Sequence, residues 1–323
     1  MNAQPEKPPR NRQLWKPLLA IAVGLAVSYS FLPITVATLW VVSMKVRGNA
    51  AHCPWPRILT FFPDLKKFTD RVAEHQASLA VERFDSRWGI ELISDGKRRF
   101  WIRRGGDKLD GQGLLAYLLA EHEWMVSQHP GKAVKRGDIV IDCGAHVGVF
   151  TRNALDLGAE KVIAVDPDPT QVECLRRNFA EEVAAGKVVV VPKGVWSSES
   201  SLALHIGGEN SGMSSLVIDR GGDSVEVPLV TIDQLVDELD LPRVDYIKFD
   251  IEGAEREALK GGLKTLRNYR PRLMVESYHR QDDMTVLPQI IAQGHEDYRM
   301  TCGACELSAE FKGQIVPHYA FYE

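Results

Sequence analysis

Residues 137–169 read GDIVIDCGAHVGVFTRNALDLGAEKVIAVDPDP. The pattern predicts a strand over 139–142, a helix over 147–157 and a second strand over 161–166, with a glycine-containing turn after the first strand. A strand, a helix and a strand in this order form one unit of a parallel sheet. Ligands of such sheets bind at the carboxyl ends of the strands, so the turn at 143–148 is the first candidate site.

The same alternation continues to the end of the chain. Apolar strands that alternate with helices indicate a parallel sheet covered on both faces, so the fold class is α/β. Thr231 and Gln234 form a capping-box pattern at the start of one helix. Ahead of this region we expect an amphipathic helix within 62–84, a hairpin over 88–101 and a helix over 114–129. Further strands are predicted at 188–191, 202–206, 214–218, 225–230, 245–250, 272–276, around 298 and at 316–322, and further helices at 170–180, from 231, at 254–266 and at 286–292.

The N-terminal part has a different composition. Residues 1–16 are polar and are expected to be a disordered tail. Residues 17–44 contain no charged side chain, and such a run exceeds the roughly 20 residues that span a bilayer, which favours a membrane segment over a buried core helix. Pro33 favours either a hairpin of two half-helices or one kinked span. Residues 45–85 would connect this segment to a domain over 86–323.

Acids and glycines at the first turn narrow the choice of ligand. Gly144 and Gly148 are four residues apart, which does not fit the dinucleotide fingerprint, and no P-loop lysine follows. The carboxylate of Asp142 would disfavour a pyrophosphate and suit a positively charged ligand. S-adenosylmethionine carries an ammonium group, a sulfonium and no phosphate. Asp166 ends the next strand, where an acid commonly accepts the hydroxyl groups of a ribose.

Four segments resemble the FkbM-type methyltransferase family: VIDCGAHVGVFT, AVDPDP, VTIDQL and DYIKFDIEGAEREALKGG. The resemblance extends over 137–276. It implies a Rossmann-like seven-stranded sheet, mostly parallel with a C-terminal antiparallel strand, and methyl transfer from S-adenosylmethionine, often to a hydroxyl of a sugar or polyketide. The family usually has Asn at the position of His146 and Glu at that of Asp166. The cofactor-binding residues expected on this basis are Asp142, Gly144, His146, Gly148, Asp166 and Asp250.

Further polar residues follow the later strands and are candidates for catalysis. Methyl transfer is an in-line displacement that needs alignment of the reactants, and a hydroxyl acceptor benefits from a general base or a metal. Asp250, Glu252, Glu276 and His279 fall at carboxyl ends of strands, and we predict them to be catalytic. Asp250 and Glu252 could instead cap a helix, and His279 could be a surface residue. Oxygen ligands suit Mg²⁺, but the spacing is not diagnostic, so no metal is predicted.

The remaining features bear on the partners of the protein, its compartment and its acceptor. A net charge of −4 argues against a nucleic-acid partner. Five cysteines without a framework spacing favour a reducing compartment, and Cys302 and Cys305 are expected in a turn between the final strands. The Gly- and Ser-rich insertion over 207–227 either shapes an acceptor pocket through Asn210, Ser214 and Ser215 or is a solvated hairpin.

The function predicted from the sequence is methyl transfer from S-adenosylmethionine to a hydroxyl of a saccharide or a lipid-linked glycan at the membrane. The membrane segment is the reason to place the acceptor there, and the domain would face the cytoplasm, where the methyl donor is made. Two alternatives stay open: an NAD-dependent oxidoreductase, and a non-catalytic nucleotide-binding scaffold. The oligomeric state is not predicted.

Overall fold

The computed structural model describes residues 32–104, 111–207, 210–219, 221–308, 311 and 313–323. The predicted tail over 1–16 and the first part of the predicted membrane segment, 17–31, lie outside these ranges. The rest of that segment falls in α2, which the structure describes over Leu32–Val46. Across the described ranges, no helix has both the length and the apolar character of a membrane span. The predicted membrane helix is unsupported and the membrane-anchored localisation is wrong.

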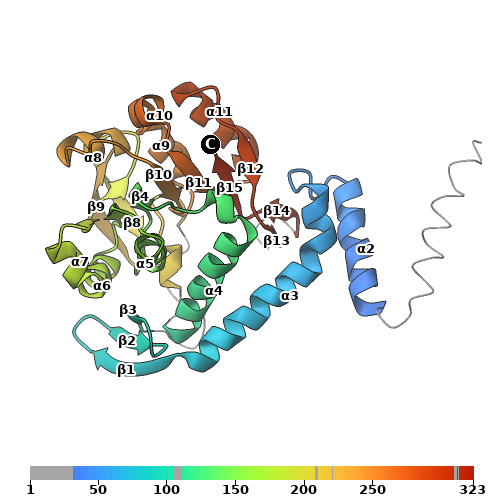
Figure 1. The fold of residues 1–323 in the computed structure, drawn as a ribbon, viewed down its shortest axis with the longest axis horizontal. Helices are drawn as coiled ribbons and strands as arrows, with labels where there is room; N and C mark the ends of the chain where they lie inside the picture. Colours follow the sequence, from blue (N-terminus) through green and yellow to red (C-terminus); the bar gives the residue numbers. More distant parts are fainter. Residues whose placement is uncertain (1–31, 105–110, 208–209, 220, 309–310, 312) are drawn as a thin grey trace, which may run out of the picture.

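A seven-stranded sheet forms the centre of the molecule, in the order β12-β15-β11-β10-β4-β5-β6 (Figure 1). The five strands from β11 to β6 are parallel, and β15 is antiparallel to both of its neighbours. This confirms the predicted α/β class and the mostly parallel sheet with a C-terminal antiparallel strand. The strand bounds are β4 (Ile139–Cys143), β5 (Lys161–Val165), β6 (Val188–Val191), β10 (Tyr246–Phe249), β11 (Arg272–Glu276), β12 (Met300–Cys302) and β15 (Tyr319–Tyr322).

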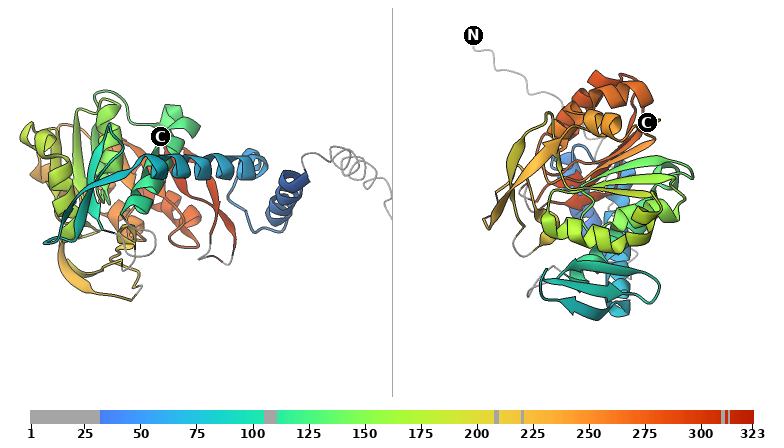
Figure 2. Two further views of the ribbon diagram at one scale, coloured as in Figure 1. Left: turned by 90° about the horizontal axis from the view of Figure 1, so that it is seen from below. Right: turned by 90° about the vertical axis from the view of Figure 1, so that its left-hand side faces the viewer.

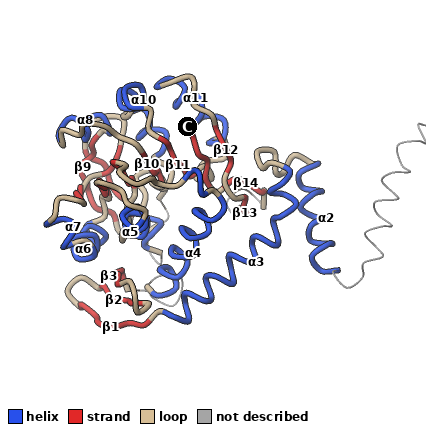
Figure 3. The backbone as a smooth tube through the Cα atoms, in the orientation of Figure 1, coloured by secondary structure: helices blue, strands red, loops and turns tan. Residues whose placement is uncertain are grey.

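Alternating side chains of these strands build two apolar layers, because successive residues of a strand point to opposite faces. Val140 and Val162 pack with residues of α4 and α5 on one face. Ile141 and Ile163 pack with residues of the helices α8, α9, α10 and α11 on the other face. Figure 3 shows helices on both sides of the strands. The helix bounds are α4 (Gln112–Gln128), α5 (Val149–Asp156), α6 (Pro169–Asn178), α7 (Ala180–Ala184), α8 (Ile232–Glu238), α9 (Glu255–Lys260), α10 (Leu263–Tyr269) and α11 (Asp283–Gly294).

The elements before the sheet pack against helices that cover it, α3 (Trp55–Ser78) against α4 and the strand β3 (Arg99–Arg103) against α6. α3 lies along α4, as Figure 1 shows. A small antiparallel sheet follows, β1 (Ala80–Asp85), β2 (Ile90–Ser94) and β3, and lies at one end of the molecule (Figure 2). It contains the predicted hairpin, whose turn is closed by Asp95 accepting from the backbone N–H groups of Lys97 and Arg98. A 3₁₀ turn, η2 (Pro130–Lys132), follows the end of α4.

Two predicted elements differ in the structure. The single helix over 254–266 is divided into α9 and α10 at Gly261 and Gly262, and a side chain at Gly261 would collide with the backbone oxygen of Trp196. The insertion over 207–227 contains a 3₁₀ turn, η3 (Ser211–Met213), and the first part of β9 (Ser224–Val230), which pairs with β8 (Ser201–His205) and the short β7 (Gly194–Val195) ahead of the insertion. The predicted strand over 214–218 is reduced to one bridge between Ser215 and His205. The capping box of Thr231 and Gln234 is present.

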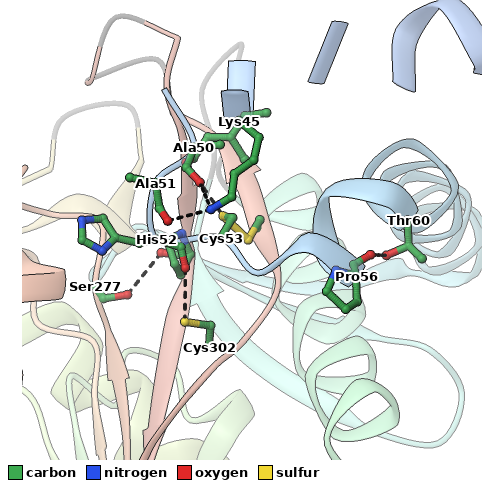
Figure 4. Close-up of a disulfide and its surroundings, with 12 residues drawn as sticks. Lys45, Ala50, Ala51, His52, Cys53, Pro56, Thr60, Ser277 and Cys302 are labelled. Atoms are coloured by element: carbon green, nitrogen blue, oxygen red, sulfur yellow. Dashed lines mark hydrogen bonds between the residues drawn. A yellow bond between two sulfur atoms is a disulfide. The ribbon is translucent and has the colours of Figure 1, made fainter. Parts of the chain in front are cut away.

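A disulfide joins Cys53 to Cys305, with Cα atoms 6.2 Å apart (Figure 4). Cys305 begins β13 (Cys305–Leu307), which pairs with β14 (Ile315–Pro317). Residues 302–305 connect two strands as predicted, but the cysteine spacing, which favoured a reducing compartment, gave no reason to expect this disulfide. Cys302 is a free thiol beside the carbonyl of His52. The bridge ties the start of α3 to residues 252 positions later in the chain.

Candidate functional site

A cavity of about 310 Å³ opens at the carboxyl ends of β4, β5, β10 and β11. β4 and β10 are neighbours in the sheet, and the chain continues from β4 toward one edge and from β10 toward the other. Ligands of open α/β sheets bind at such a switch point. Of the predicted site residues, Gly144, His146, Asp166, Asp250, Glu252 and Glu276 line the cavity, whereas Asp142, Gly148 and His279 do not.

One side of the cavity is formed by the turn after β4 and the end of β5. The Asp166 carboxylate accepts the backbone N–H of His146 on one oxygen, at 2.8 Å, and that of Asp168 on the other, at 2.9 Å. Each oxygen keeps a second lone pair for a ligand. Burial, and secondarily the charge of Asp168, raise the pKa of Asp166 to about 8. Burial lowers the pKa of His146 to about 4, so its imidazole is neutral at pH 7.

A buried lysine holds the two central turns together. Lys248 in β10 donates a hydrogen bond to the carbonyl of Gly144 and lies 3.4 Å from Asp142 and 3.2 Å from Asp250. Asp142 also accepts from Thr151 and is fully buried, so its carboxylate faces α5 and Lys248 and not the cavity. Burial favours the neutral form of Asp250, but the Lys248 ammonium outweighs it and holds the pKa of Asp250 at about 2.

The two predicted glycines fill different roles. Gly144 has φ +78°, and a Cβ there would lie 1.8 Å from the backbone oxygen of Asp250. Only glycine allows the turns after β4 and β10 to approach so closely. A Cβ at Gly148 would instead overlap the ring of Phe179. Gly148 therefore serves the packing of α5 against α6, and Gly144 serves the cavity.

The opposite side of the cavity is acidic. Glu252 follows β10 in a left-handed conformation with φ 53°, and such strain in a non-glycine residue persists only where the surroundings hold it. Glu276 ends β11 and is buried. His279 lies beneath the cavity, where its Nδ1 is 2.9 Å from Glu255 and its Nε2 faces both Glu252 and Glu276. The sequence-predicted catalytic residues Asp250, Glu252, Glu276 and His279 are thus brought together.

A second histidine and further residues of this acidic side were not predicted from the sequence. His318 lies between β14 and β15 with its Nε2 3.4 Å from Glu276 and 3.0 Å from Glu121 of α4. The ring of Tyr278 lies against both imidazoles, with centroid distances of 4.5 and 4.7 Å. No motif marks Glu121 or His318, because each comes from a distant part of the chain.

Dense negative charge shifts the pKa values of this region. Burial and the Asp250 carboxylate raise the pKa of Glu276 to about 8, although His318 offsets part of the effect. Burial opposes protonation of His279 and His318, but the surrounding carboxylates outweigh it and raise both pKa values well above the ordinary range. The region therefore attracts cations or protons.

The insertion closes part of the cavity. Asn210 and Ser214 line it, together with η3. The hydroxyl of Ser214 donates to Asp168, and that of Ser211 contacts Nε2 of His146 at 3.0 Å. Ser215 does not line the cavity but donates to the backbone oxygen of Glu252 at 2.6 Å. Of the two alternatives for the insertion, the structure supports a pocket wall.

A family model described as the methyltransferase FkbM domain matches residues 142–300. No curated protein matches the sequence. A solved structure of an FkbM methyltransferase from Methylobacillus flagellatus KT is 16% identical with a TM-score of 0.42, and the alignment covers 83% of this chain and 62% of that one.

Two further structures are similar at the same level. A SAM-dependent methyltransferase from Agrobacterium tumefaciens is 14% identical with a TM-score of 0.40, covering 75% of this chain and 70% of that one. A precorrin-6y C5,15-methyltransferase from Geobacter metallireducens GS-15 is 15% identical with a TM-score of 0.36, covering 68% and 90%. The family model gives the identification: residues 142–300 of this chain belong to the FkbM methyltransferase family.

Proposed function

We propose that this protein transfers a methyl group from S-adenosylmethionine to a hydroxyl oxygen of a polyhydroxylated acceptor of the saccharide class. The observation that supports the proposal most strongly is the orientation of Asp166. Its carboxylate is buried at the cavity wall and fixed by two backbone N–H groups, an arrangement suited to accept both hydroxyls of an adenosine ribose.

The acidic side of the cavity suits the other reactant. The acceptor oxygen attacks the methyl carbon, the carbon–sulfur bond breaks, and its electron pair stays on sulfur to give S-adenosylhomocysteine. The hydroxyl proton must leave, and Asp250, Glu252 and Glu276 line the cavity to receive it, with His279 beneath them. A hydroxyl acceptor needs such a group, because its own pKa lies far above 7. Several carboxylates can also accept hydrogen bonds from neighbouring hydroxyls of a saccharide.

Calorimetric titration of the full chain with S-adenosylmethionine, S-adenosylhomocysteine and NAD tests the donor. The two sulfur ligands are expected to bind, and Asp166→Asn is expected to weaken them by roughly 10- to 100-fold, the value of one or two hydrogen bonds to a charged group. Glu296→Ala removes an exposed acid and is the matched control. Tighter binding of NAD than of the sulfur ligands would refute the donor assignment and favour an oxidoreductase.

Transfer of isotope-labelled methyl groups to a panel of saccharides tests the acceptor class. Labelled product that resists alkaline hydrolysis identifies an ether and supports methylation at a hydroxyl. Donor binding without turnover on any member of the panel would contradict the acceptor assignment and support the scaffold alternative.

A further inference from the structure

Six side chains from distant parts of the chain converge at the acidic side of the cavity. We call them the carboxylate–histidine cluster: Glu121, Asp250, Glu252, Glu276, His279 and His318. Among the described residues, two groups within this cluster have ligand atoms close enough to hold a metal ion. One group comprises Asp250, Glu252 and His279, and the other Glu121, Glu276 and His318.

Glu276 lies between the two histidines. Its Oε2 is 3.6 Å from Nε2 of His279, and its Oε1 is 3.4 Å from Nε2 of His318. Glu252 lies 3.7 Å from Nε2 of His279 on the other side. A single carboxylate thus faces both imidazoles, one with each oxygen.

Both imidazoles are oriented from behind by a carboxylate. Nδ1 of His279 is 2.9 Å from Glu255, and Nδ1 of His318 is 2.7 Å from Glu306. A carboxylate at the far nitrogen is the usual partner of a metal-binding histidine, because it fixes the ring and makes the other nitrogen more basic. Each ring therefore directs Nε2 into the cluster.

The atoms directed into the cluster lack hydrogen-bond partners. Nε2 of His279, Nε2 of His318 and Oε2 of Glu276 are buried and make no hydrogen bond. His279 is 5% exposed, His318 7% and Glu276 4%. Buried polar atoms without partners are uncommon and need a cause. Nε2 of His318 lies 3.0 Å from Glu121, and the other separations in the cluster, 3.4 to 3.7 Å, are longer than ordinary hydrogen bonds. Ligands that share one ion at about 2.0 to 2.2 Å lie about 3.0 to 3.5 Å apart.

We propose that the carboxylate–histidine cluster binds two divalent transition-metal ions that share Glu276. One ion lies among Asp250, Glu252 and His279, and the other between Glu121 and His318. Two imidazoles with four carboxylates are the donor set of two-ion carboxylate centres. The mixture of nitrogen and oxygen donors selects Mn²⁺ or Fe²⁺ over Mg²⁺ and Ca²⁺. Two divalent ions also neutralise the four carboxylates of the cluster.

The cluster borders two cavities. Glu121, Glu252 and Glu276 line the main cavity. His318 and Glu306 line a second cavity of about 230 Å³ between α3, α4 and β13. Tyr117 lines both.

The chemical role of the metal centre rests on the proposed function. Ions at the acidic side would stabilise negative charge on the acceptor oxygen as its proton leaves to a carboxylate or to solvent. The oxygen then forms its bond to the methyl carbon while the carbon–sulfur bond breaks. The metal centre would thus supply the activation that a hydroxyl acceptor needs, and the binding of ions itself requires neither donor nor acceptor.

Metal binding to the full chain tests the proposal with Mn²⁺ alone as the probe. The protein is stripped with a chelator, dialysed against Mn²⁺, and measured by elemental analysis and low-temperature electron paramagnetic resonance. About two Mn²⁺ per chain and a spin-coupled spectrum are expected. Less than one ion per chain, or one ion with an uncoupled six-line spectrum, would overturn the paired centre.

Variants locate the ions and separate the two proposals. His279→Gln and His318→Gln should each lose at least one ion, and Glu306→Gln, which only orients His318, should weaken Mn²⁺ about 10- to 100-fold. His295→Gln is the control for a histidine outside the cluster. Retention of two ions in both cluster variants would refute the assignment.

Each variant is also titrated with S-adenosylhomocysteine. Retained binding shows that the donor site is folded, so a variant that loses only its metal has not misfolded. Donor binding without metal would refute only this inference, and metal without donor binding would refute only the proposed function.

Discussion

Substituting Gly144 by alanine tests whether the close approach of two turns builds the cavity. The added Cβ would lie 1.8 Å from the backbone oxygen of Asp250, whereas real contacts of this kind are not shorter than 3.0 Å. The turns must therefore separate by at least 1.2 Å, the difference between these distances. Because the obstacle is backbone, no rotamer change relieves it. We expect about 1 to 3 kcal/mol for this overpacking, in addition to about 1 to 2 kcal/mol for a left-handed alanine.

Gly96→Ala is the matched control. Gly96 has φ +83° against +78° for Gly144, but nothing lies within 4 Å of the position that its Cβ would take, so this variant bears only the left-handed cost. Urea unfolding gives both free energies of unfolding, and calorimetry gives the affinity for S-adenosylhomocysteine. A shift of about 1 Å at a reacting centre can lower the rate on the order of 100-fold, so methyl transfer should fall in Gly144→Ala only. Equal destabilisation of the two variants, or unchanged transfer in Gly144→Ala, would refute the close-approach explanation.

Three more outcomes are expected. Lys248→Met leaves Asp142 and Asp250 without their buried cation, so urea unfolding should show a loss of about 3 to 5 kcal/mol; a loss below about 1 kcal/mol would contradict the central role of this lysine. Cys53→Ser removes the bridge to Cys305 and should cost about 2 to 4 kcal/mol, and the variant should unfold alike with and without reductant, unlike the parent protein. Affinity for S-adenosylhomocysteine should rise with pH up to about 8 and then level off. The reason is that Asp166 has its pKa raised to about 8, and only its ionised form accepts from both ribose hydroxyls. The same dependence of affinity on pH in Asp166→Asn would exclude this group as the cause.

Local patterns were sufficient to predict the main sheet and part of the site. Asp166, Asp250 and Glu276 follow buried strands, and parallel strands bring their carboxyl ends to one edge regardless of the loops between them. The direction of a side chain was harder to predict. Asp142 belongs to the same edge, but it points toward Thr151 and Lys248, and the sequence pattern contains no information about that choice.

Contacts between distant residues explain what the sequence did not reveal. Glu121 and His318 meet only after α4 and β15 have packed on the sheet, and neither lies in a recognisable motif. A predicted helix divides at Gly261 and Gly262, and the carbonyl of Trp196 occupies the space that a side chain at Gly261 would take. For the apolar run over 17–44 the sequence instead gave a wrong prediction, since its composition alone indicated a membrane segment. In the described part of that run, Val41 and Met44 of α2 pack against Cys53, Ile58 and Phe61.

The strand order has a consequence for how the molecule is assembled. β12 precedes β15 in the chain, but among the strands that the structure describes its one partner is β15, which lies between β12 and β11. During synthesis β12 must therefore wait for a later strand before it can join the sheet. His318 directly precedes that strand, so it reaches Glu276 in the same late event. A nascent chain can thus complete the Asp166 side of the cavity while the acidic side is still missing a histidine.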